Sequence, residues 1–120
     1  MLFDTMGAVA PKKAVVLFDG TSLDGWTKMD GSPAQWQMED KTMKVKPGTG
    51  DICTRKLFAD HFLHLEFRLS DMPEAKGQGK SNSGVFLQGR YEIQVLDSSG
   101  WKVPGLGDCG AIYDQYAPLT

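Results

Sequence analysis

The sequence has no long apolar run, no excess of basic residues and no cysteine–histidine spacing typical of a metal site. No stretch approaches the roughly 20 apolar residues that a membrane-spanning helix needs. The net charge of −2 argues against nucleic acid as a partner, because phosphate binding requires a dense basic patch. Two histidines without an HxH or HExxH spacing make a zinc site unexpected. We interpret Cys53 and Cys109 as buried thiols, with a disulfide as the alternative in an oxidising compartment.

A sustained helical period is also absent. The 120 residues suffice for one small domain with a core, and we expect it over 14–120, after an N-terminal tail at 1–13. The start has no basic region and Asp4 interrupts its apolar run, so it does not match a signal peptide. Glycine, with 14 copies, punctuates the chain, and short runs between the turns predict strands at 14–18, 36–38, 42–45, 52–54, 62–69, 83–88, 91–96 and 111–113. This pattern predicts an all-β antiparallel sandwich or jelly roll.

The stretch "GQGKS" at 77–81 invites comparison with a phosphate-binding loop. A Walker A motif needs a glycine five residues before its Gly-Lys pair, and Glu74 stands there instead. The motif must also lead into a helix, whereas "SGVFLQ" predicts a strand. We therefore interpret 70–83 as a polar loop at the rim of a sheet, where functional loops are common.

Alternation along three predicted strands, 62–69, 83–88 and 91–96, separates an apolar face from a polar one. An antiparallel sheet with one solvated side would explain this without any ligand. Carboxylate, guanidinium, imidazole and amide groups can equally form hydrogen bonds with a bound molecule. Both interpretations stay open for the polar positions, which are His64, Glu66, Arg68, Gln88, Glu92 and Gln94.

Asn82 and the three tryptophans also have two interpretations each. Asn82, the only asparagine, precedes a predicted strand, so it is either a turn residue or an amide directed at a ligand across the sheet. Trp26, Trp36 and Trp101 either pack against the core and loops or stack on sugar rings.

Four blocks of the chain together resemble the 3-keto-disaccharide hydrolase domain family. They are "LFDGTSLDGW", "GDICTRKLFADHFLHLEFRL", "NSGVFLQGRYEIQVLDS" and "DCGAIYDQYAP", in order from about Val15 to Pro118. The resemblance implies a concanavalin A-like jelly roll, related in fold to lectins and glucanases, that acts on sugars oxidised at C3. It also implies a periplasmic or extracellular setting, with a signal peptide missing from this chain.

The resemblance implies a site on the polar strand faces and their ends. Its catalytic candidates are Glu66, Glu92 and Asp97, with His64 as an alternative base, and Asp97 would need a bulge or a strand end to join the others. The implied substrate contacts are Arg68, Asn82 and Gln94, to which the polar strand positions add His64 and Gln88 as substrate-binding candidates. No cofactor is evident, and a divalent metal held by carboxylates is an alternative without a diagnostic ligand spacing.

Domains of that family continue with further strands beyond the point that corresponds to Thr120. We therefore expect an incomplete sandwich with an open sheet edge, completed by another chain in a homo-oligomer. Two further hypotheses remain, because fold does not decide function. One is a non-catalytic carbohydrate-binding module, and the other is an inactive truncated fragment that self-associates.

Overall fold

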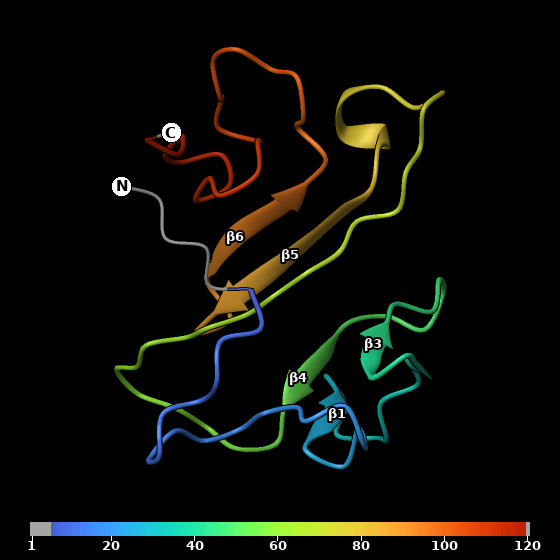
Figure 1. Cartoon of the computed structure of the whole chain (residues 1–120), viewed down its shortest axis with the longest axis vertical. Helices are drawn as coiled ribbons and strands as arrows, with labels where there is room; N and C mark the ends of the chain where they lie inside the picture. The colour runs from blue at the N-terminus through green and yellow to red at the C-terminus, as the bar shows by residue number, and fades with distance from the viewer. Residues whose placement is uncertain (1–5, 120) are drawn as a thin grey trace. The chain divides into compact units, whose positions relative to one another are not determined.

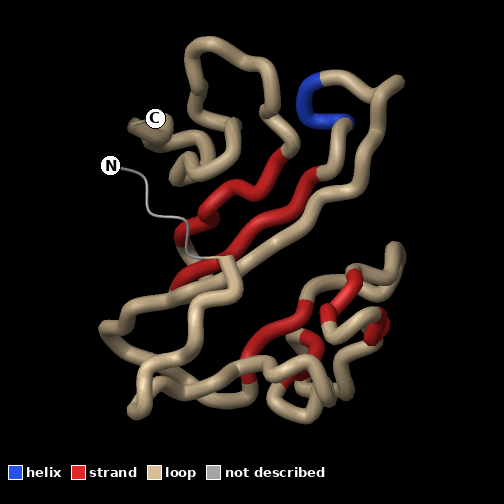
Figure 2. Tube along the Cα trace, viewed as in Figure 1, coloured by secondary structure: helices blue, strands red, loops and turns tan. Residues whose placement is uncertain are grey.

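The computed structural model describes residues 6–119, which contain six β-strands, one 3-10 turn and no α-helix. The strands are β1 (Trp26–Lys28), β2 (Gln37–Glu39), β3 (Thr42–Lys44), β4 (Ile52–Thr54), β5 (Asn82–Leu87) and β6 (Tyr91–Leu96), and the turn is η1 (Gly77–Gly79) (Figures 1 and 2). They pair antiparallel as β1–β4, β2–β3 and β5–β6. The all-β antiparallel prediction is confirmed. Within residues 6–119, no helix has the length and apolar character of a membrane span.

The chain divides into two compact units, with the boundary between His64 and Leu65. In the first unit, β1 pairs with β4, and the predicted strand 52–54 has its predicted bounds. The sequence pattern missed β1. The predicted strand at 14–18 is wrong, since no strand is assigned there. Instead, the indole N–H of Trp26 donates to the carbonyl of Leu17 at 2.9 Å and holds this segment as a loop.

The strands β2 and β3 form a short hairpin in the same unit. Asp40 and Lys41 connect them with φ angles of 48° and 58°, the left-handed pair that tight two-residue hairpin loops require. Both strands lie within one residue of their predicted positions at 36–38 and 42–45.

In the second unit, β5 and β6 form the longest ladder, with Asn82 opposite Leu96 and Leu87 opposite Tyr91. The predicted strand 83–88 ends one residue early, because Gln88 and Gly89 have φ angles of 56° and 63° and close the hairpin turn. Gln88 is therefore a turn residue, and its predicted place on the strand face is wrong.

Residues 110–113 extend this hairpin along β6. The backbone N–H of Gln94 donates to the Ala111 carbonyl at 3.0 Å, and the N–H of Tyr113 donates to the Glu92 carbonyl at 2.9 Å. Only Ile112 forms bridges in this segment, so the predicted strand at 111–113 is reduced to an isolated pairing. The small core of the unit gathers here and consists of Val95, Leu96 and Ala111.

The predicted strand at 62–69 is wrong, since no strand is assigned there. Residues 65–69, which belong to the second unit, run alongside β5 (Figure 1). Next to them, Ser81 Oγ donates to the Ser70 carbonyl at 2.8 Å. Leu65 and Phe67, which should face a core, are 44% and 49% exposed. The alternation identifies the two faces of an extended segment, but a ladder also requires a hydrogen-bonded partner strand, which alternation within one segment does not identify.

Candidate functional site

One face of the β5–β6 hairpin collects three of the predicted site residues. The register places Gly84 opposite Gln94 and Phe86 opposite Glu92, so these residues share a face with Asn82. Gln94 is 2% exposed, whereas Glu92 is half-buried and Asn82 is exposed. The sequence thus predicted correctly that Glu92 and Gln94 lie on the same side of one strand.

The amides on this face are connected through Gln78 of η1. Asn82 Nδ2 donates to Gln78 Oε1 at 2.9 Å and to the Gln78 carbonyl at 3.1 Å. Gln94 Nε2 donates to Gln78 Oε1 at 3.1 Å and to the Gly107 carbonyl at 3.2 Å. Gln78 Nε2 donates to that same carbonyl of Gly107 at 2.8 Å. The loop interpretation of 77–79 agrees with this structure, in which η1 leads into a strand rather than a helix.

The carboxylate of Glu92 lies over the backbone of Gly84. A β-carbon at position 84 would stand 2.7 Å from Glu92 Cδ and would overlap a carboxylate oxygen. Real β-carbons do not approach heavy atoms so closely, so the glycine leaves the space that the Glu92 side chain fills. The φ angle of Gly84 is not positive, so its backbone conformation does not require glycine.

Asp97 follows the end of β6 and forms a half-buried ion pair. Its Oδ2 accepts from Lys80 Nζ at 3.0 Å, and both side chains are 20% exposed. Its Oδ1 accepts from the hydroxyl and the backbone N–H of Ser99. The hydrogen bond from the Ser99 hydroxyl, followed by that from Lys80, lowers the pKa of Asp97 from 3.8 to about 2.

We expect the stabilising contribution of Asp97 to disappear between about pH 4 and pH 2. The folded pKa is depressed below the unfolded value, so the contribution is present above the unfolded pKa of 3.8 and is lost as the pH falls toward about 2. The free energy of unfolding of the wild type should exceed that of Asp97→Asn at pH 5, and the difference should shrink over this window. A difference that stays constant from pH 5 to pH 2 would contradict the charged role of Asp97.

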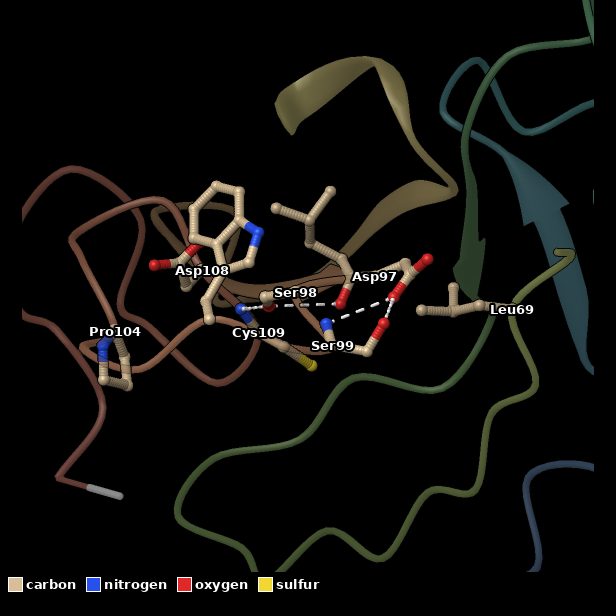
Figure 3. Close-up of a pocket in the computed structure, with 9 residues that line it drawn as sticks. Leu69, Asp97, Ser98, Ser99, Pro104, Asp108 and Cys109 are labelled. Atoms are coloured by element: carbon tan, nitrogen blue, oxygen red, sulfur yellow. Dashed lines mark hydrogen bonds between the residues drawn. The ribbon is translucent and has the colours of Figure 1, made fainter. Parts of the chain in front are cut away.

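Asp97 also lines a pocket of about 360 Å³ within the second unit (Figure 3). Its walls are mainly apolar, with Leu69, Leu96, Trp101, Pro104 and Cys109 beside Asp97, Ser98, Ser99 and Asp108. Asp108 is 3% exposed and accepts from the Gly105 N–H through Oδ2, while its Oδ1 has no hydrogen-bond partner among the described residues. The sequence analysis did not identify Gln78 or Asp108. Gln78 donates to the carbonyl of Gly107, 29 positions away, and Asp108 accepts from Gly105 within an irregular loop.

The tryptophans separate into two structural roles. The indole N–H groups of Trp26 and Trp36 donate to the carbonyls of Leu17 and Gly50, so these rings brace loops of the first unit. Trp101 is 48% exposed at the pocket and is the tryptophan that fits a stacking role.

The remaining predicted residues lie elsewhere. Glu66 and Arg68 are exposed on the segment beside β5, Gln88 is in the hairpin turn, and His64 is exposed at the end of the first unit. Cys53 and Cys109 are free, half-buried thiols, so the disulfide alternative is not found. In residues 6–119, no three or more His, Cys, Asp or Glu side chains group as they would to hold a metal ion.

Comparison with known proteins gives two matches. The family model of the 3-keto-alpha-glucoside-1,2-lyase-like domain matches residues 13–120. The fold is similar to the crystal structure of a "putative glycosyl hydrolase" from Parabacteroides distasonis, with 36% sequence identity and a TM-score of 0.76. The match covers 92% of this chain and 47% of that one, so the chain spans about half the length of the matched protein. No curated protein matches the sequence significantly.

Proposed function

Since the chain belongs to the 3-keto-alpha-glucoside-1,2-lyase-like family and is a glycosyl hydrolase-like domain, we propose that it cleaves the glycosidic bond of 3-keto-glycosides. The observation that carries the proposal is the β5–β6 face, where a half-buried carboxylate lies on the same face as amides fixed by hydrogen bonds. Such a face offers a base together with groups that can recognise sugar hydroxyls and carbonyls.

The reaction begins at the carbon between the ketone and the glycosidic carbon. A ketone at C3 acidifies the proton on C2, which a general base removes to form an enolate. The electrons of the enolate then form the C1–C2 double bond as the C1–O bond breaks, and the departing oxygen takes up a proton. Addition of water across this double bond gives the free 3-keto sugar, so the overall reaction is hydrolysis.

Glu92 is the general base in this proposal. Its carboxylate is held over Gly84 on the face that carries Asn82 and Gln94, whereas the alternative bases Glu66 and His64 are exposed outside the strands. Arg68 is proposed to contact the enolate oxygen, and Asn82 a sugar hydroxyl.

We assign Asp97 the role of an anchor rather than an acid. A group with a pKa of about 2 is deprotonated at neutral pH and cannot supply the proton that the leaving group needs. Its bond to Lys80 instead ties the end of β6 to the loop that enters β5, and its bonds to Ser99 hold the turn after β6.

Incubation of the chain with 3-keto-trehalose tests the proposal through release of glucose. Trehalose itself is the control, because its C2 proton is not acidified, and it should remain intact. Binding of unoxidised oligosaccharides without turnover of either sugar would favour the carbohydrate-binding module instead. Loss of turnover in EDTA that added divalent cations restore would support the divalent-metal alternative.

We further propose that the protein works in the periplasm or outside the cell. We also propose that a second copy of the chain covers the apolar surface of the second unit. Leu65 and Phe67, on the segment beside β5, are 44% and 49% exposed, and a partner that buries such apolar side chains would stabilise the unit. Sedimentation velocity should give a mass above that of one 13.2 kDa chain. A monomer at micromolar concentration would contradict the homo-oligomer.

A further inference from the structure

Gln78 has no role in the reaction above, yet its side chain contacts two of the residues on the proposed sugar-binding face. It lies in η1, in the polar loop between the segment 65–70 and β5. Its Oε1 accepts from Asn82 and from Gln94, and its Nε2 donates to the Gly107 carbonyl. One carboxamide therefore connects β5, β6 and the 104–108 loop.

These contacts determine the orientation of each side-chain amide, that is, which positions its oxygen and its nitrogen occupy. A flipped Gln78 would direct its NH2 group at the NH2 groups of Asn82 and Gln94, and its oxygen at the Gly107 carbonyl, so every one of its side-chain bonds would become repulsive. Position 107 also favours this arrangement. A β-carbon there would stand 3.0 Å from Gln78 Nε2, so glycine allows the side chain to approach the carbonyl.

The arrangement determines what Asn82 offers to a ligand. An amide nitrogen has two hydrogens, and those of Asn82 Nδ2 are committed to the carbonyl and to Oε1 of Gln78. Asn82 is exposed, so its Oδ1 is the atom of the amide left to meet a ligand. An oxygen acceptor fixed in this way suits a hydroxyl donor.

Gln94 depends on Gln78 for a different reason. Its side chain is 2% exposed, and its Nε2 donates to Gln78 Oε1 and to the Gly107 carbonyl. Its Oε1 is buried and has no hydrogen-bond partner among the described residues, so the two bonds of Nε2 hold the group. A buried polar group that loses a partner is costly, so removal of Gln78 should reorient Gln94.

We propose that Gln78 is the positioning residue of this face: it holds Asn82 with its oxygen outward, as an acceptor for a sugar hydroxyl, and keeps Gln94 in place beneath it. The inference rests on the proposed function, that this face binds a 3-keto-glycoside. Gln78 acts through its two neighbours and itself touches neither substrate nor reacting atoms.

Two substitutions at position 78 separate positioning from simple stabilisation. Gln78→Met keeps the length of the side chain and loses all three of its bonds. Gln78→Glu keeps oxygens that accept from Asn82 and Gln94, but loses the donor to Gly107 and brings a charge beside that carbonyl. A positioning role predicts that KM for 3-keto-trehalose rises about tenfold in Gln78→Met, the effect of about one net hydrogen bond, and less in Gln78→Glu. A purely structural role predicts the opposite order, because the charge disturbs the loop more.

The matched control is Gln115→Met, which alters an exposed glutamine of the same unit outside this group of amides. Side-chain NH2 resonances of Asn82 and Gln94, assigned by their loss in Asn82→Asp and Gln94→Glu, give a second measurement that needs no activity. Both should shift in Gln78→Met and stay near their places in Gln115→Met.

The outcomes distinguish the two proposals. Turnover by the wild type with an unchanged KM in Gln78→Met overturns the positioning role and leaves the proposed function intact. If the wild type neither binds nor cleaves 3-keto-trehalose, the proposed function fails, and with it the role of Gln78 in sugar recognition. Unchanged Asn82 and Gln94 resonances in Gln78→Met would overturn the positioning itself in either case.

Discussion

Replacement of Glu92 by glutamine should lower kcat for 3-keto-trehalose by about 10²- to 10⁴-fold, the range that a positioned general base contributes. The substitution keeps the size of the side chain and its place over Gly84 but removes the basic oxygen. KM should change little, because the amide can still form hydrogen bonds. Steady-state release of glucose from 3-keto-trehalose measures both constants.

Two matched glutamates control this experiment. Glu74 is exposed in the loop before η1, so Glu74→Gln changes the net charge equally and should leave kcat unaltered. Glu66→Gln tests the alternative base in the segment beside β5. If Glu66→Gln is inactive while Glu92→Gln retains full activity, Glu66 is the base and the assignment of Glu92 is wrong.

Substitution of Gly84 by alanine should reduce kcat about 10²-fold, a loss that a misplacement of about 1 Å can produce. The new methyl group would occupy the space of the Glu92 carboxylate, and the flexible glutamate would move to another rotamer. Stability should hold or rise slightly, since alanine restricts the unfolded chain and the backbone here accepts it. Thermal unfolding and kcat, measured on one preparation, would separate the two effects.

A double-mutant cycle shows whether Gly84 acts through Glu92. In the Glu92→Gln background the base is already gone, so adding Gly84→Ala should cost little more activity. Independent, multiplicative losses would mean that the alanine disturbs something other than Glu92. Full activity in Gly84→Ala alone would show that the reaction does not need Glu92 in this position.

Alternation predicted the β6 strand with both of its bounds and the shared face of Glu92 and Gln94. This worked because the two-residue period of side chains is a local property of the backbone. The same pattern failed at 62–69, where the structure has no ladder, and at 14–18, where an indole binds the backbone of a loop. At 14–18 the outcome depends on Trp26, nine positions from Leu17, and at 62–69 on the lack of a partner strand, neither of which alternation within the segment reports.

Within the candidate site, too, the sequence predicted some residues and not others. The sequence alone predicted Asn82, Glu92 and Gln94 as site residues, because their places depend only on the positions of two strands and one turn. Gln78 contributes through its hydrogen bond to the carbonyl of Gly107, 29 positions away. Asp108 contributes through its hydrogen bond from the N–H of Gly105, three positions away in an irregular loop. Neither residue has a local signal of a role in a site, because Gln78 is a polar residue in a polar loop and Asp108, next to Gly107, is a typical turn residue.

The close approach of Glu92 to Gly84 has a consequence for how related sequences can diverge. A chain with a side chain at the position of Gly84 has no room for a glutamate that folds back across the neighbouring strand. Relatives that replace this glycine should therefore carry a shorter residue at position 92, so the two positions should covary. A relative in which positions 84 and 92 have both changed would carry its general base on another strand. This pair of positions is therefore a marker that divides the family by catalytic arrangement.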